Sequence, residues 1–243
     1  MFAKAKKKGF QILALHHAEA ILKYDMPDAA GQIEEALLEI EIPVEELIRG
    51  GGGEGKVTQR MRNFFAQEGF GWKKHNFQIT KTVDGVEKES TSHEIDHVKH
   101  FAKGVFALEI EWNNKDPFFD RDLENFKRLH ADGAVSVAAI ITRGKSLHDA
   151  LPEIITDFAV RNQIDSVDKV GAFYNPTPRQ KDLFARAAKQ YGSFEKGWAH
   201  AFTADKFGEA TTHWRKLEDR VKRGVGNPCP LLLIGIPKQV IVQ

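Results

Sequence analysis

Three acidic residues, Asp96, Glu109 and Glu111, are the side chains of this sequence best placed by type and spacing to do chemistry. Glu109 and Glu111 stand two positions apart in the apolar run 105–112, which predicts a β-strand. Successive strand side chains point to opposite faces, so both glutamates are expected on one face. Carboxylates buried this close together are unfavourable unless a cation neutralises them. Oxygen ligands suit Mg²⁺, which also binds substrate phosphate, so the pattern favours phosphodiester hydrolysis.

A plainer interpretation of the Glu-Ile-Glu pattern is a half-buried strand whose acidic face meets solvent, an arrangement common in soluble proteins. The apolar residues that precede Glu109 leave little room for a solvent-facing strand. Asp96 lies in a separate segment that a hairpin could fold back beside the pair. Both features favour the metal-binding interpretation. The spacing of the glutamates alone does not decide between this interpretation and the solvent-facing strand.

Length and composition narrow the class of protein. With 243 residues the chain can bury a sizeable core, and we expect one domain, 1–243, with a helical insertion at about 145–206. The net charge of +1 argues against a protein that coats polyanions through bulk electrostatics. Cys229 is the single cysteine and is interpreted as structural; it excludes an intramolecular disulfide and fits a reducing cytoplasm. No membrane-spanning segment is predicted.

Hydrophobic periodicity predicts an α/β chain. Strands are expected at 10–15, 72–82, 101–112, 134–142 and 231–236, and helices at 28–39, 57–67, 120–130, 146–158, 175–207 and 214–221. Asp28 and Ser146 are the expected N-caps of two of these helices. The runs 134–142 and 231–236 are almost continuously apolar, which is typical of strands covered on both faces.

Two further motifs are weaker evidence for a functional site. Residues 50–57 are similar to a phosphate-binding loop, but Val57 stands where such a loop needs Ser or Thr to bind magnesium. A linker, or a loop that closes over a polyanion, is favoured instead. His93, His97 and His100 lie around the first acid, but their spacing matches no zinc motif. Surface positions or phosphate contacts are the alternatives for these histidines.

The order of elements and four sequence segments are similar to a known family. The segments are Gln32-Ile33-Glu34-Glu35, Gly71-Trp72-Lys73, Asp96 followed by 105–111, and Arg223-Gly224-Val225-Gly226 followed by 230–236. The chain resembles the type II restriction endonucleases of the BglII type, which include BstYI and lie close to BamHI in the PD-(D/E)xK nuclease superfamily. The resemblance spans most of the chain outside about 145–206. It implies a restriction-endonuclease-like mixed central sheet flanked by helices.

The resemblance also implies roles for the acids. Asp96 and Glu109 are then expected to bind one or two Mg²⁺ ions, with the Ile110 carbonyl as an additional ligand. The third position usually holds Lys in the superfamily and Gln in the BglII type, whereas Glu111 resembles the BamHI arrangement. Glu111 is therefore expected either to deprotonate the attacking water directly or to orient it.

The resemblance further implies a homodimer on palindromic double-stranded DNA, because twofold protein symmetry matches twofold DNA symmetry. A cognate DNA methyltransferase is expected in the same system. The helix 120–130 is the candidate dimer element, although its apolar face could instead cover the sheet. The residues expected to read bases are Asn113, Asn114, Lys115, Lys222, Arg223 and Asn227. A repair or junction nuclease of the same superfamily and a non-catalytic DNA-binding protein on a nuclease frame are the alternatives.

Overall fold

The structure is a computed structural model that describes residues 1–49 and 54–242. The glycine run of the predicted phosphate-loop mimic, at 50–53, therefore lies outside the described residues. In the two described ranges, no helix combines the length and the apolar character needed to cross a membrane.

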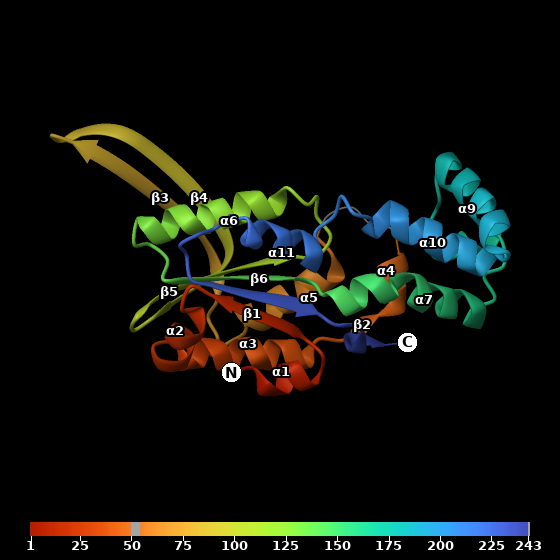
Figure 1. The fold of residues 1–243 in the computed structure, drawn as a ribbon, viewed down its shortest axis with the longest axis horizontal. Coiled ribbons are helices and arrows are strands. Elements are labelled where there is room, and N and C mark those ends of the chain that lie inside the picture. Colours follow the sequence, from red (N-terminus) through yellow and green to blue (C-terminus); the bar gives the residue numbers. More distant parts are fainter. Residues whose placement is uncertain (50–53, 243) are drawn as a thin grey trace.

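A six-stranded mixed sheet forms the centre of the molecule (Figure 1). Its strands, in spatial order, are β1 (Gln11–Leu15), β7 (Leu231–Ile236), β6 (Val137–Arg143), β5 (Gly104–Glu111), β4 (Val86–Phe101) and β3 (Lys73–Val83). β5, β6 and β7 are parallel to one another, and the other neighbours are antiparallel. Every residue of β6 and β7 is buried, which is why their sequences are almost continuously apolar.

Helices cover both faces of the sheet, as Figure 1 shows. One face carries α1 (Ala3–Lys7), α2 (Ala18–Tyr24), α3 (Pro27–Glu39), α4 (Val44–Ile48) and α5 (Lys56–Ala66). The other carries α6 (Phe118–Ala131) and α11 (Trp214–Lys222). Beyond one end of the sheet lie α7 (Lys145–Arg161), α8 (Val167–Val170), α9 (Pro178–Tyr191) and α10 (Phe194–Phe207), and β2 (Ile42–Pro43) pairs with β8 (Ile241–Val242) after η1 (Lys238–Val240). The predicted α/β class with a mixed central sheet is confirmed.

The expected strand 101–112 corresponds to β5, and only its first residue, Phe101, belongs to β4. β4 ends at Phe101 and β5 begins at Gly104, so the chain turns back on itself between them. Gly104 has φ +150°, and a Cβ there would lie 2.2 Å from the Ser136 hydroxyl, so this tight turn requires glycine. The hairpin has a direct consequence for the site, because it brings Asp96 on β4 beside Glu109 on β5.

Two predicted helix caps are wrong. Met26 is the N-cap of α3, with Pro27 in its first turn, and Asp28 lies inside the helix. Gly144 is the N-cap of α7, and a Cβ at this position would lie 2.7 Å from the Ile236 carbonyl oxygen, which explains why the residue is glycine. The Ser146 hydroxyl accepts a hydrogen bond from the Lys238 backbone N–H at 3.3 Å instead of capping its own helix.

The apolar face of α6 is used within the chain. Phe119, Leu123, Phe126 and Leu129 are all buried and pack against the sheet together with Trp214 of α11. The interpretation in which this face covers the sheet is therefore confirmed.

Close packing of α9 against α10 gives a testable prediction for stability. A Cβ on Gly197 would lie 2.3 Å from the Ala188 backbone nitrogen, so Gly197→Ala is expected to destabilise the protein by about 1–3 kcal/mol through overpacking. Gly31→Ala in α3 is the matched control, because its Cβ meets no atom within 4 Å. It is expected to add about 0.5–1 kcal/mol of stability. Urea unfolding measures both, and unchanged stability of Gly197→Ala would contradict the close crossing.

Candidate active site

Asp96 and Glu109 face each other across the β4–β5 hairpin. The register pairs His97 with Leu108, which sets Asp96 opposite Glu109 one step further along the ladder. The Asp96 backbone N–H donates to Glu109 Oε1 at 3.3 Å. Because directly opposed residues of antiparallel strands point to the same face, the two carboxylates are neighbours on one face of the sheet.

Glu109 and Glu111 lie together on the face of β5 that α6 covers. Their exposed fractions are only 5% and 3%. Leu108 and Ile110 point to the opposite face and join the core between the sheet and α1–α5. The strand alternation thus separates the acids from the apolar side chains, and it holds two carboxylates in a nearly dry environment.

A fourth acid, Asp122 on α6, completes this buried group. Asp122 is 1% exposed, and its Oδ1 lies 2.8 Å from Arg121 Nη2. The same Arg121 atom is 3.6 Å from Glu111 Oε1, so one guanidinium reaches both carboxylates. Sequence reasoning missed Asp122. The sequence signal that could have identified it is its spacing, three residues after Phe119 and four before Phe126. This spacing puts the aspartate on the apolar, buried face of an amphipathic helix.

Burial and mutual repulsion raise the pKa values of this group. For Glu109, removal from water is the main cause and the charges of Asp122 and Asp96 add to it, so its pKa stands well above the ordinary value. Burial and Asp122 likewise raise the pKa of Glu111, against the hydrogen bond that Asn114 Nδ2 donates to Glu111 Oε2 at 2.6 Å. Burial raises the pKa of Asp122 as well. A cation bound between Asp96 and Glu109 would stabilise the charged forms of these two carboxylates.

The donor set fits a hard divalent cation, since it consists of carboxylate oxygens. In the part of the chain that the structure describes, Asp122 Oδ2 is buried without a hydrogen-bond partner. Among the same residues, Asp96, Glu109 and Glu111 do not form a group with all donor atoms within 4.8 Å of one another. The Asp96 side chain is 55% exposed, and its Oδ1 lies 3.7 Å from Lys74 Nζ.

A cleft of about 1160 Å³ opens beside the acids, and both Asp96 and Glu111 line it. Its walls carry many basic side chains. They are Arg49, Lys56, Arg62, Lys73, Lys74, Arg121 and Lys206, and they outnumber the acids of the lining, which are Glu46, Glu54, Asp96 and Glu111. Because a cleft rich in cations attracts a polyanion, the acids face a space suited to a nucleic-acid backbone.

The residues predicted to read DNA bases fall into two separated sets. Asn113, Asn114 and Lys115 follow the carboxyl end of β5, whereas Lys222 to Asn227 precede the amino end of β7, which runs parallel to it. The structure therefore places the two sets at opposite ends of the sheet. Within the first set, Asn113 Nδ2 donates to the Lys206 carbonyl at 3.1 Å, and the Asn114 amide is bound to Glu111.

The second set has local partners too. Lys222 pairs with Glu218 at 3.2 Å and Arg223 with Asp219 at 3.0 Å, both within α11 and its C-terminal end. Asn227 Oδ1 lies 2.6 Å from His16 Nε2. The charged heads of these two cations remain largely exposed and accessible to a ligand.

The histidines near Asp96 are not assembled into a metal site. His97 is buried against Phe65, and burial lowers its pKa to about 4, so its imidazole is neutral. His97 Nδ1 lies 3.3 Å from the Leu108 carbonyl. His93, His97 and His100 do not converge as donors anywhere in the described ranges. Cys229 is fully buried, and burial raises its pKa to about 12, in keeping with a structural role.

The raised pKa values predict a pH-dependent effect on stability. An acid whose pKa is higher in the folded than in the unfolded state binds its proton more tightly in the folded state. It therefore favours folding at low pH, and this contribution is lost as the pH rises above the pKa of the acid in the unfolded chain. Asp122→Asn is therefore expected to raise the melting temperature of the metal-free protein by about 2–4 °C at pH 8 and to change it little at pH 4. Asp165→Asn, at a fully exposed helix pair, is the control and should change little at either pH. Melting curves in EDTA test this, and destabilisation by Asp122→Asn at pH 8 would contradict it.

A family model described as Restriction endonuclease BglII/BglIII matches residues 10–236. The match runs from the residue before β1 to the last residue of β7, and so includes every strand of the six-stranded sheet and all four acids. A search of curated proteins gave no significant match.

Proposed function

Because the chain belongs to the BglII/BglIII restriction endonuclease family, we propose that it is a magnesium-dependent type II enzyme that cuts palindromic double-stranded DNA. The observation that carries this proposal is the buried pair Glu109 and Glu111 on β5, with Asp96 across the hairpin, at the wall of a basic cleft. Restriction endonucleases generally use a divalent metal ion. Oxygen donors alone line this part of the site, which favours Mg²⁺.

In this proposal Asp96 and Glu109 hold Mg²⁺, with the Ile110 carbonyl as a further ligand. When bound there, the ion would supply positive charge at the scissile phosphate and would lower the pKa of a bound water. Lys74 Nζ lies 3.7 Å from Asp96 Oδ1 and only 2.6 Å from Glu94 Oε1, so Asp96 would be available as a ligand. Glu109 is fixed by the Asp96 backbone N–H and needs little adjustment.

Glu111 is the proposed proton acceptor. Its pKa is raised toward the pH of the reaction, which suits a general base, and Asn114 fixes the orientation of its carboxylate. Arg121 lies between Glu111 and Asp122 and limits the repulsion between them. Glu111 thus can take the proton of the water that attacks the phosphorus in line.

The proposed assembly is a homodimer in which each active site cuts one strand. The polar face of α6 is the candidate contact, since its apolar face is buried on the sheet. We further propose that residues 1–243 form one endonuclease domain in which α7 to α10, at about 145–206, are a helical insertion. A cytoplasmic location and a cognate DNA methyltransferase belong to the same proposal.

Digestion of a long mixed-sequence duplex with Mg²⁺ tests the function. Discrete bands are expected for a restriction enzyme. Smears or cuts at branched structures would indicate a repair or junction nuclease of the same superfamily. Binding without any product would indicate a non-catalytic DNA-binding protein.

A further inference from the structure

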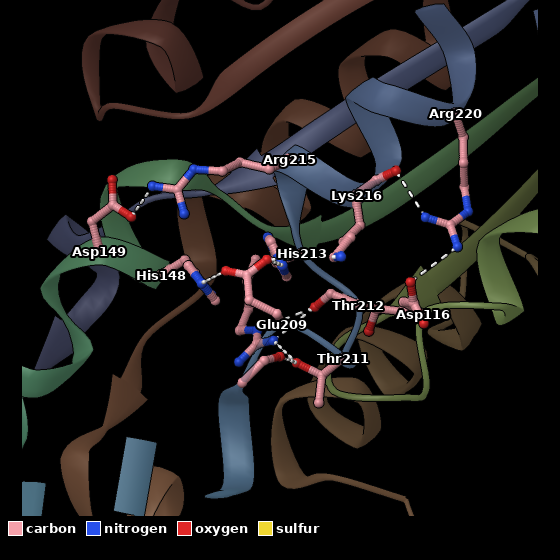
Figure 2. Close-up of polar contacts among 12 residues, drawn as sticks. Asp116, His148, Asp149, Glu209, Thr211, Thr212, His213, Arg215, Lys216 and Arg220 are labelled. Carbon is pink, nitrogen blue, oxygen red and sulfur yellow. Dashed lines mark hydrogen bonds and ion pairs between the residues drawn. The ribbon is translucent and has the colours of Figure 1, made fainter. Parts of the chain in front are cut away.

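A second group of metal-ligating side chains lies away from the acids. His148 is in the first turn of α7, Glu209 follows α10, and His213 is the N-cap of α11 (Figure 2). One donor atom from each residue lies within 4.8 Å of the other two. His148 Nε2 is 3.7 Å from Glu209 Oε1, and His213 Nε2 is 3.6 Å from Glu209 Oε2. One carboxylate therefore approaches the Nε2 atoms of two imidazoles that come from different elements.

The two histidines are not satisfied by ordinary hydrogen bonds. His213 is fully buried, and neither of its ring nitrogens has a hydrogen-bond partner within residues 1–49 and 54–242. His148 Nδ1 is likewise buried without a partner there. Because buried polar atoms are nearly always paired, such unpaired nitrogens beside a carboxylate point to a missing ligand.

We propose that His148, Glu209 and His213 bind a divalent transition metal ion, with zinc as the expected occupant, at a site separate from the catalytic acids. Two imidazoles and one carboxylate are a ligand set that suits zinc, whereas magnesium prefers oxygen alone. Ligand atoms of tetrahedral zinc are about 3.3 Å apart. Binding therefore draws these donors together slightly and turns the rings out of their parallel stack, in which the centroids are 4.0 Å apart.

The surrounding cations are compatible with a bound ion. Arg215 is paired with Asp149, and Arg143 is engaged by the Thr212 carbonyl and by the Thr211 hydroxyl. Lys216 Nζ lies 3.8 Å from Glu209 Oε2 and would compete with the metal for this carboxylate. Its ammonium is partly exposed and can withdraw into solvent, and Glu209 itself is 69% exposed, which leaves room for water as the fourth ligand.

The site would act on the position of Glu111. Thr212, next to His213, donates its backbone N–H to the Asn114 carbonyl at 2.8 Å, and its hydroxyl accepts from the Asn114 N–H at 3.0 Å. Asn114 in turn donates to Glu111. A metal that ties α7 to the Glu209–His213 segment would therefore rigidify the loop that orients Glu111. The role of this metal would be structural, and it would contact neither the DNA substrate nor the attacking water.

Zinc and cobalt binding test the proposal. The full chain carrying Glu109→Gln, which weakens the catalytic metal site, is loaded with Zn²⁺ and dialysed, and its metal content is measured. We expect one zinc per chain, and with Co²⁺ the strong visible absorption of a four-coordinate site with histidine ligands. Adding His148→Ala or Glu209→Gln should weaken zinc binding by about tenfold or more. Asp157→Asn, at an exposed position of α7 more than two turns from His148, should leave zinc binding unchanged, and Lys216→Gln should tighten it.

Loss of zinc binding in Glu209→Gln would not be explained by misfolding, because Glu209 is 69% exposed and the substitution removes no buried contact. Circular dichroism of each variant verifies that the fold is kept. Failure of the parent chain to retain zinc, or equal retention by the parent, His148→Ala and Glu209→Gln, would overturn the proposal. DNA cleavage is not the readout, so the outcome is independent of the proposed nuclease activity.

Discussion

Glu109→Gln is expected to reduce DNA cleavage in Mg²⁺ by at least about a thousandfold, and Asp96→Asn to do the same, while DNA binding persists. Loss of a metal ligand removes several kcal/mol of transition-state stabilisation, and each 1.36 kcal/mol is about a tenfold change in rate. Glutamine keeps the shape of Glu109 but not its charge, so the buried hairpin should fold as before. Single-turnover cleavage of a duplex that carries the DNA sequence cut by the unmodified chain measures the rate. A gel-shift assay in Ca²⁺ measures binding of the same duplex.

Glu89→Gln is the matched control for this pair. Glu89 lies on the same strand as Asp96 but in its exposed distal half, where it pairs with Lys81. Its cleavage rate should match that of the unmodified chain. Substantial cleavage by either Asp96→Asn or Glu109→Gln in Mg²⁺ would remove these residues from the proposed metal site.

The second large effect is expected at Glu111. If this carboxylate accepts the proton of the attacking water, Glu111→Gln should slow cleavage by about 10²–10⁴-fold. The unmodified chain should cut faster as pH rises through the neutral range, because a base with a raised pKa is protonated and idle at lower pH. The Glu111→Gln variant should lose that pH dependence, since its amide does not titrate.

A pH–rate series on both proteins distinguishes the two roles considered for Glu111. A glutamine variant that cuts at the original rate, with an unchanged pH profile, would assign Glu111 to orientation of the water alone. Asn114→Ala provides an intermediate case. It removes the 2.6 Å hydrogen bond to Glu111 but keeps the carboxylate, so we expect a smaller loss, of about tenfold, with the pH dependence retained.

The sequence by itself determined the local parts of this protein. Alternation along 105–112 was sufficient to set Glu109 and Glu111 on one face, and uninterrupted apolar runs identified β6 and β7, because strand periodicity and burial are encoded over a few consecutive residues. The resemblance to a restriction endonuclease family was likewise carried by short segments, and the family match over residues 10–236 confirms it.

Only the tertiary structure decided which distant residues meet. Asp122 joins the acids because α6 lies over β5, and the basic wall of the cleft combines side chains from several elements. His148 and His213 are far apart in the chain and meet only through the packing of α7 beside the start of α11. Periodicity specifies which face of an element is buried, but the partner of that face depends on long-range packing. For the same reason the sequence grouped Asn113 with Asn227, and the parallel course of β5 and β7 separates them.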